Sequence, residues 1–245
     1  MSQDARSELV RLFEVMARLR APDGCPWDRA QTHASLLPYL LEETYETIQA
    51  VEEGDPQELA EELGDLLVEV AMHTAIAAEE DGFDLEVVAA RAADKMISRH
   101  PHVFGGAMVD SEEQLLRNWE ALKRTEKPER TSALDGIPMA LPALALANSA
   151  QRRAGRSHRD CGPPLPGAQE LGPRLAELMG RLTGPEAGDD PGLLVGELLW
   201  LVVVAARQLK IDPEGSLRRV ARTWMESYRE AELKLSPPPP GADRR

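Results

Sequence analysis

The sequence is poor in cysteine, in aromatic residues and in strand-forming runs. Its two cysteines, Cys25 and Cys161, lie far apart and lack CxxC spacing, so neither a disulfide framework nor a zinc site is expected. Aromatic residues make up 4% of the 245 residues, against 42% hydrophobic residues. This composition is typical of a helical protein with one large core or two small ones. Strand-like alternation is nearly absent, and the sequence predicts an all-α fold.

Long apolar runs and clusters of basic residues are also missing. The longest apolar stretch, Leu198 to Ala206, is far shorter than the ~20 residues of a membrane span, and no signal peptide opens the chain. We therefore expect a cytoplasmic protein with no membrane partner. The net charge is −14, and residues 1–107 hold 22 Asp/Glu against 8 Lys/Arg, whereas residues 108–245 hold 20 of each. This acidity argues against nonspecific nucleic-acid binding and is compatible with a nucleotide bridged by metal ions.

What the chain has in excess is carboxylate, concentrated in two short motifs. The first is Glu42-Glu43-Thr44-Tyr45-Glu46 and the second is Glu62-Leu63-Gly64-Asp65. Glu43 and Glu46 are three residues apart, as are Glu62 and Asp65, so each pair projects from one side of its helix. A Glu-rich run is most often a solvated helix face. Here leucines interleave with the acids and make both helices core elements, which favours acids that face a partner helix.

A turn between the two motifs brings them together. In Gly54-Asp55-Pro56 the glycine suits the end of one helix, the aspartate the N-cap of the next, and the proline its first position. Counted from this bend, Glu46 comes level with Glu62 and Glu43 with Asp65. Helices packed ~8 to 10 Å apart leave room for an ion between facing carboxylates. Ligands that are all oxygen favour a hard cation, Mg²⁺ or Mn²⁺.

Apolar periodicity predicts helices throughout the chain. The first half reads as a four-helix bundle with helices at about 4–20, 36–53, 56–80 and 84–99. A connector follows, in which Ser111 and Gln114 form a capping box for a helix to about 126. Prolines and glycines predict a loop-rich region over 136–167. Three further helices are expected at about 168–183, 192–210 and 214–235, before a disordered tail of four prolines at 236–245.

An internal repeat links the two halves. Gly64-Asp65-Leu66-Leu67 returns as Gly196-Glu197-Leu198-Leu199, so the apolar frame is duplicated. The acids are not duplicated, because in this register Glu62 becomes Leu194 and Glu43 becomes Arg174. We expect the second copy to be unable to hold a metal cluster.

The acidic motifs and their flanks resemble the MazG family of nucleoside triphosphate pyrophosphohydrolases. The likeness runs through Gly24-Cys25-Pro26-Trp27-Asp28, both acidic motifs and Arg99-His100-Pro101-His102-Val103-Phe104. It is fullest over residues 8–107 and continues in register to about 235, as in two-domain members. The resemblance implies tandem MazG-type helical bundles completed by dimerisation into a homodimer. It divides the chain into a catalytic domain (1–107), a helical connector (108–135) and a degenerate second domain (136–235).

The resemblance also implies a reaction. It is the Mg²⁺-dependent hydrolysis of nucleoside triphosphates, NTP or dNTP, to the monophosphate and pyrophosphate by the first domain. The family's metal ligands fall on Glu43, Glu46, Glu62 and Asp65. Glu42 belongs to the motif as well, and would orient or deprotonate the attacking water.

Several further residues are candidates for a functional or a structural role. Lys95 is a candidate phosphate contact, or a solvated helix lysine; Trp27 could stack on a base, or anchor a tight turn. Glu69 and His73 continue the stripe of acids at four-residue steps and are expected to support the site or the fold. His100 and His102, at a helix end, are expected to cap or pack.

Two other functions compete with this enzymatic one. A ferritin-type di-iron bundle needs Glu-x-x-His pairs, and no histidine here has a glutamate three positions before it. A catalytically weak helical module, which binds nucleotides or serves a regulatory or interaction role without turnover, is the runner-up.

Overall fold

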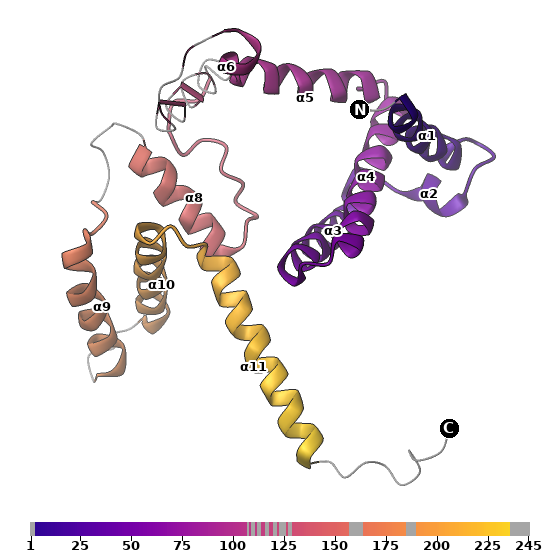
Figure 1. Ribbon diagram of the computed structural model, residues 1–245. Coiled ribbons are helices and arrows are strands. Elements are labelled where there is room, and N and C mark those ends of the chain that lie inside the picture. Colours follow the sequence, from indigo (N-terminus) through magenta and orange to yellow (C-terminus); the bar gives the residue numbers. More distant parts are fainter. Residues whose placement is uncertain are drawn as a thin grey trace. The chain divides into compact units, whose positions relative to one another are not determined.

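The computed structural model describes residues 3–106, 108, 111, 114–115, 118–119, 122, 126, 129–156, 164–184 and 190–235. Within these residues the regular elements are helices and no strand occurs, which confirms the all-α prediction. The chain divides into two compact units, Met1–Glu126 and Lys127–Arg245, both visible in Figure 1. The division falls inside the predicted connector.

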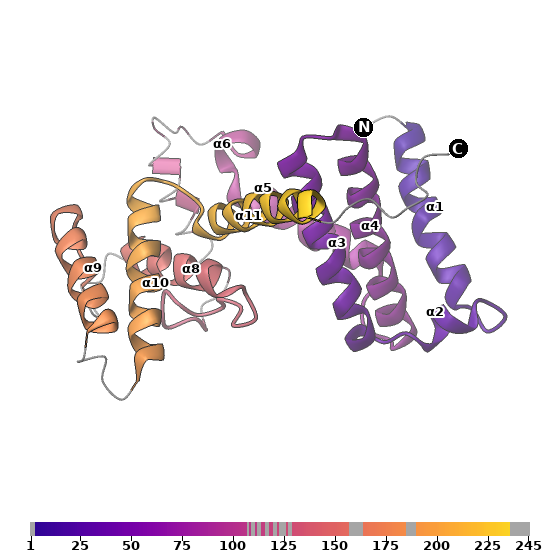
Figure 2. The same ribbon diagram turned by 90° about the horizontal axis from the view of Figure 1, so that it is seen from below.

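The first unit is built around one central helix. Its elements are α1 (Gln3–Arg20), α2 (Pro26–Ala30), α3 (His33–Glu53), α4 (Pro56–Glu79), α5 (Leu85–Arg99) and α6 (Pro101–Phe104). Figure 2 shows α1, α3 and α4 side by side, with α4 in contact with both α3 and α1. The four predicted helices agree with α1, α3, α4 and α5 to within three residues, whereas the short α2 and α6 were not predicted.

The turn between α3 and α4 forms as the sequence predicts. Gly54 ends α3 in the left-handed conformation, with φ +76°, which a residue without Cβ adopts readily. The Asp55 carboxylate accepts hydrogen bonds from the N–H groups of Gln57 and Glu58 (2.8 and 3.3 Å), and Pro56 occupies the first position of α4. This three-residue connection folds α3 back along α4.

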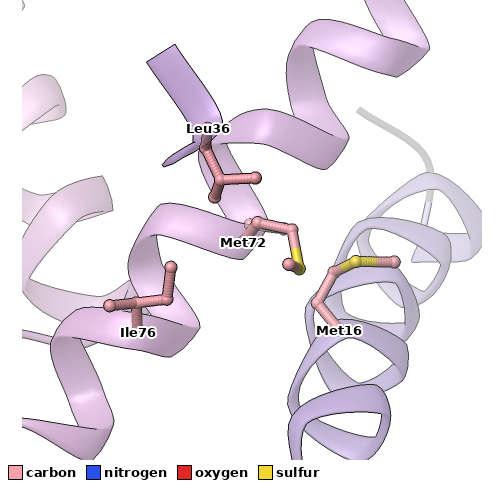
Figure 3. Close-up of a cluster of buried hydrophobic side chains, with 5 residues drawn as sticks. Met16, Leu36, Met72 and Ile76 are labelled. Carbon is pink, nitrogen blue, oxygen red and sulfur yellow. The ribbon is translucent and has the colours of Figure 1, made fainter. Parts of the chain in front are cut away.

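The core of the first unit is made of aliphatic and thioether side chains. Met16 of α1, Leu36 of α3 and Met72 and Ile76 of α4 are buried together with Ala71, as Figure 3 shows for the labelled side chains. Methionine fills irregular gaps without aromatic bulk. The low aromatic content of the chain is therefore compatible with a packed core.

A buried arginine locks the ends of α1 and α4 together. Arg20 Nε and Nη2 donate to the two carboxylate oxygens of Glu79 at 2.8 and 2.7 Å. Its Nη1 donates to the carbonyl oxygens of Asp28 and Gln31 at 2.6 and 3.1 Å. One guanidinium thus connects α1, α4 and the C-terminal half of α2.

The second unit consists of four described helices. These are α8 (Ala143–Arg156), α9 (Ala168–Thr183), α10 (Pro191–Gln208) and α11 (Pro213–Leu235). α10 contacts the other three, and its buried leucines pack with those of α9. The last three agree with the predicted helices to within two residues. The expectation of a loop-rich region over 136–167 is wrong in part, because α8 lies within it. Pro142 starts this helix by accepting a hydrogen bond on its carbonyl from the Leu146 N–H (2.8 Å), a place where proline is well tolerated.

α10 is the one helix of the described part that is long and apolar enough to cross a membrane by length and composition. Its Leu194, Leu201, Val203 and Val204 are buried in the second unit. Its other large apolar residues Leu193, Val195, Leu199, Trp200 and Val202 are exposed, so the core accounts for only part of its apolar character.

Two predicted features fall wholly or partly outside the described residues. The tail at 236–245 does so entirely. Of the connector helix, the Gln114 N–H donates to Ser111 Oγ (3.2 Å), the first half of the predicted capping box.

Candidate metal centre

Three of the predicted carboxylates meet between α3 and α4. Glu43 of α3 and Glu62 and Asp65 of α4 each place one oxygen within 4.8 Å of the others. Oxygens on opposite sides of a six-coordinate Mg²⁺ are ~4.2 Å apart, since each bond is ~2.1 Å. The spacing of the three oxygens is therefore close to that of ligands around one hard cation.

One carboxylate oxygen of this cluster is buried without a hydrogen-bond partner. Glu62 Oε2 is buried and has no hydrogen-bond partner among the described residues. A buried carboxylate oxygen without a donor is costly. A bound cation satisfies such an atom, so the residues present fit a metal ion.

Electrostatics in the cluster are uniformly repulsive. Burial raises the pKa of Glu43, and the charges of Asp65, Glu46, Glu62 and Glu42 raise it further. Burial likewise raises the pKa of Glu62, with Glu46 and Asp65 as the next causes. Every charge that acts on these two groups is negative, so a divalent cation is the natural counter-charge.

The other two acids of the first motif, Glu42 and Glu46, are outside the group of three whose oxygens meet. Glu46 acts by charge on both Glu43 and Glu62, and Glu42 acts on Glu43. Both are on α3: Glu42 directly precedes Glu43, and Glu46 follows it by about one turn.

The two other candidate residues stand apart from the cluster. Lys95 lies on α5, where its charge lowers the pKa of Glu126, and no ion pair joins it to the acids in the described part of the chain. Trp27 lies on α2, about half exposed, with its ring edge-on to that of Tyr39 at a centroid distance of 6.0 Å. This contact fits the packing role of Trp27, while its exposed face leaves stacking open.

One layer of polar residues on α4 was only partly anticipated. Glu69 and His73 are separated from Asp65 by steps of four residues, and both carry a buried polar atom, Glu69 Oε2 and His73 Nε2, without a hydrogen-bond partner. Sequence reasoning did not single out His33 of α3, whose Nδ1 faces that of His73. The sequence around His33 contains no pattern that indicates a contact with a histidine on another helix.

His100 and His102, at the C-terminal end of α5, make capping and packing contacts. His100 Nδ1 lies 2.6 Å from the carbonyl oxygen of Met96, to which it must donate, and its ring packs 5.6 Å from that of His102. Arg99, beside it, pairs with Glu126 and lies over the ring of Trp119. These are contacts that end α5 and fasten the connector to it.

The second unit has different chemistry at the corresponding positions. Leu194, in register with Glu62, is 4% exposed and belongs to the core cluster with Leu171 and Leu178. Arg174 and Pro173 of α9 stand where the first motif has its paired glutamates. Among the described residues of this unit, no group of three metal-ligating side chains forms.

Comparison with known proteins gives a consistent result. The MazG nucleotide pyrophosphohydrolase domain matches residues 31–104, the segment that carries all five acids. The nucleoside triphosphate pyrophosphohydrolase/pyrophosphatase MazG of Thermotoga maritima is 38% identical over 222 residues, which are 90% of this chain and 84% of that protein. The nucleoside triphosphate pyrophosphohydrolase of Escherichia coli is 36% identical over 232 residues, 92% of this chain and 88% of that one.

A solved structure is similar to part of the chain. The mazG-related protein from Thermotoga maritima is 31% identical, with a TM-score of 0.41 over 46% of this chain and 97% of that one. The family membership rests on the sequence relatives, which align with both units. The chain belongs to the MazG family of nucleotide pyrophosphohydrolases.

Proposed function

We propose that this chain hydrolyses nucleoside triphosphates, NTP or dNTP, to the nucleoside monophosphate and pyrophosphate in a Mg²⁺-dependent reaction. As a member of its family it is a hydrolase that acts on acid anhydrides. The observation that carries the proposal is the meeting of Glu43, Glu62 and Asp65 across the α3–α4 hairpin, inside the matched domain.

The ligand set consists of Glu43, Glu46, Glu62 and Asp65. When bound there, Mg²⁺ or Mn²⁺ would neutralise triphosphate charge and make water a better nucleophile. Glu43 and Glu62, both half-buried, would hold the ion together with Asp65, and Glu46 would add a carboxylate from one turn further along α3. Their mutual repulsion keeps the site selective for a multiply charged cation.

The remaining residues act on water and on the substrate. Glu42, adjacent to the ligand Glu43, orients the attacking water or accepts its proton. Attack of this water at the α-phosphorus breaks the bond to the oxygen that bridges the α- and β-phosphates and releases pyrophosphate, whose negative charge a bound cation would stabilise. Lys95 is proposed to contact the phosphates and Trp27 to stack on the base. Both require movement or a second chain to reach the cluster, since neither touches it in the described residues.

The active site is proposed to lie in the first unit alone. The burial of Leu194 in the core of the second unit, and the basic Arg174 at the position of Glu43, do not favour a carboxylate cage there. Duplication has preserved the helices of the second copy without its acids.

We further propose that the protein is a cytoplasmic homodimer. The helices that carry the acids also expose large apolar side chains, which a monomer would leave in water. On α3 these are Leu37, Leu41 and Tyr45, and on α4 they are Leu63, Leu67 and Val70. A second copy that covers this face would complete the bundle and shield the cluster from solvent.

The proposal is tested by incubating the protein with each NTP and dNTP in the presence of Mg²⁺. Monophosphate and pyrophosphate in equal amounts are expected from at least one of them. Glu62→Gln should lower turnover ~100-fold or more, because it removes a ligand charge. The control is Glu61→Gln, which removes the same charge from the adjacent, exposed position. Saturable nucleotide binding without product would instead favour the nucleotide-binding module.

A further inference from the structure

A hydrogen bond between two histidines joins α3 to α4 at the end of the hairpin opposite its turn. His33 is the first residue of α3 and His73 lies in the second half of α4, and their Nδ1 atoms are 2.7 Å apart. Both side chains are half-buried. Because one ring donates to the other across the interface, the bond fixes how far α3 lies along α4 at this end.

The carboxylates of the cluster lie about midway between this bond and the turn. Glu43 is ten residues after His33 and eleven before Gly54, distances of ~15 and ~16 Å along α3. On α4, Asp65 is eight residues before His73, or ~12 Å. The turn and the histidine pair therefore hold the two helices together on either side of the acidic cluster.

The cluster depends on the register of α3 against α4. The carboxylates of Glu43, Glu62 and Asp65 repel one another, and their oxygens meet within 4.8 Å across the two helices. A slip of one helical turn displaces them by ~5.4 Å, which is more than this spacing. The core of the unit includes Met16 and Met72, and methionine adapts readily to changed packing. Apolar contacts alone therefore define the register weakly.

The polar layer around His73 has a cost that an apolar core avoids. Glu69 Oε2 and His73 Nε2 are buried without hydrogen-bond partners among the described residues, and Glu69 is only 8% exposed. Buried polar atoms in this state are unfavourable. A buried polar contact between helices fixes their register at such a cost in stability.

The second unit shows the apolar solution in a related helix pair. In the 132-residue offset of the internal repeat, Glu69 becomes Leu201 and His73 becomes Ala205. Leu201 is 6% exposed in the core of this unit, and Ala205 packs against that core. The copy without the acids thus also lacks the polar layer. The helix pair folds without this layer, so its cost goes together with the carboxylate cluster.

We propose that His33 and His73 are positioning residues for the metal site. Their hydrogen bond sets the register of α3 against α4, and this register places Glu43 on one helix opposite Glu62 and Asp65 on the other. The inference rests on the metal site of the proposed function. The pair acts through the helices, because His73 lies about two turns from Asp65 along α4.

The test is the affinity of the full chain for Mn²⁺, measured by electron paramagnetic resonance of the free ion at about pH 8, above the range in which histidines titrate. His73→Phe keeps a ring but removes the hydrogen bond. It should weaken Mn²⁺ binding about tenfold, as expected when a supporting contact of a metal site is lost. His73→Asn, whose amide lies near the position of Nδ1, should restore most of the affinity.

His33→Phe removes the same bond from the other helix. It should weaken Mn²⁺ binding as much as His73→Phe does, and the double variant should be no weaker than either single variant. The matched control is Ile76→Ala, which opens a cavity in the same core and leaves the hydrogen bond in place. It should lower the melting temperature and leave the Mn²⁺ affinity unchanged.

Unchanged affinity in both phenylalanine variants overturns the inference and leaves the metal site standing. An equal loss of affinity in Ile76→Ala also overturns it, because general loosening of the core would then explain the effect. If the wild type binds no Mn²⁺, or if its binding survives in Glu62→Gln, the metal site fails and the inference fails with it.

Discussion

Nδ1 of His33 lies 2.7 Å from Nδ1 of His73, and the two imidazole rings stack 5.0 Å apart at 7° to one another. At this distance one nitrogen must donate and the other accept, so the two histidines cannot both be protonated. Burial lowers the pKa of His73, and the charge of His33 lowers it further. This pair joins α3 to α4, the two helices that also contribute Leu36 and Met72 to the core drawn in Figure 3.

The histidine pair makes stability depend on pH. The pKa of His73 in the folded protein lies below the unfolded value of 6.5, so the unfolded chain binds more protons below about pH 6.5. Stability is therefore complete above that pH and falls as the pH drops through 6.5 toward the folded pKa. Between about pH 7.5 and pH 5.5 the melting temperature of the wild type should therefore fall relative to that of a variant without His73, because Glu43, Glu62 and Glu69, whose pKa values are raised, act in the opposite direction in both proteins.

His73→Phe, which keeps the ring, isolates this effect. Glu69 has its pKa raised by burial, so it acts in the opposite direction and stabilises the fold as the pH falls. Both proteins retain Glu69, and the difference between their melting curves reports on the histidine. A variant that loses as much stability as the wild type over this range would contradict the assignment.

Metal binding should stabilise the first unit. The cluster of Glu43, Glu62 and Asp65 is repulsive without a cation, and an ion that binds only the folded state adds ~2.7 kcal/mol at a concentration of 100 times its Kd. Addition of Mg²⁺ should raise the melting temperature of the wild type and of Glu61→Gln, and leave Glu62→Gln nearly unchanged. Equal shifts in all three proteins would show that the ion binds elsewhere.

The Arg20–Glu79 pair should contribute strongly to stability. Arg20→Ala removes two charge-assisted hydrogen bonds and leaves the carbonyls of Asp28 and Gln31 without their donor, an expected loss of about 2–3 kcal/mol because Glu79 is half exposed. Arg18→Ala, which breaks the exposed pair with Asp23, should cost less than about 1 kcal/mol. Denaturant unfolding measures both, and equal losses would show that the burial of Arg20 is unimportant.

The second unit should not accept the missing acids. Leu194→Glu places a carboxylate in the core with Leu171 and Leu201, and a loss of roughly 3 kcal/mol or more is expected. Arg174→Glu, on the exposed face of α9, should change stability by less than about 0.5 kcal/mol. If Leu194→Glu were tolerated equally well, the core of this unit would be looser than its packing indicates.

Sequence reasoning succeeded where local chemistry determines structure. The Gly54 turn, the Asp55 cap and the spacing of the acids are short-range features, and they place Glu43, Glu62 and Asp65 together. Helix α9 follows from its periodicity to the residue. These features depend on neighbours within a few turns, which a sequence displays directly.

Prediction from the sequence failed where a contact with a residue distant in the chain determines the local structure. α8 was hidden by Pro142, which starts the helix rather than breaking it, and by the packing of Gln151, whose amide donates to the Trp200 carbonyl (3.0 Å). The pairing of His33 with His73 and of Arg20 with Glu79 likewise joins residues 40 and 59 positions apart. The position of Lys95 relative to the acids also depends on how α5 leaves α4, which periodicity does not encode.

The short turn at Gly54 has a consequence for how the protein folds. Glu43 and Asp65 are separated by 22 positions, so the site consists of contacts that are close in sequence, and bringing them together costs little loop entropy. The hairpin can close early, and its closure is also the step that forces the carboxylates together. Electrostatic repulsion between the carboxylates thus opposes this closure, and a divalent cation present during refolding would accelerate the step.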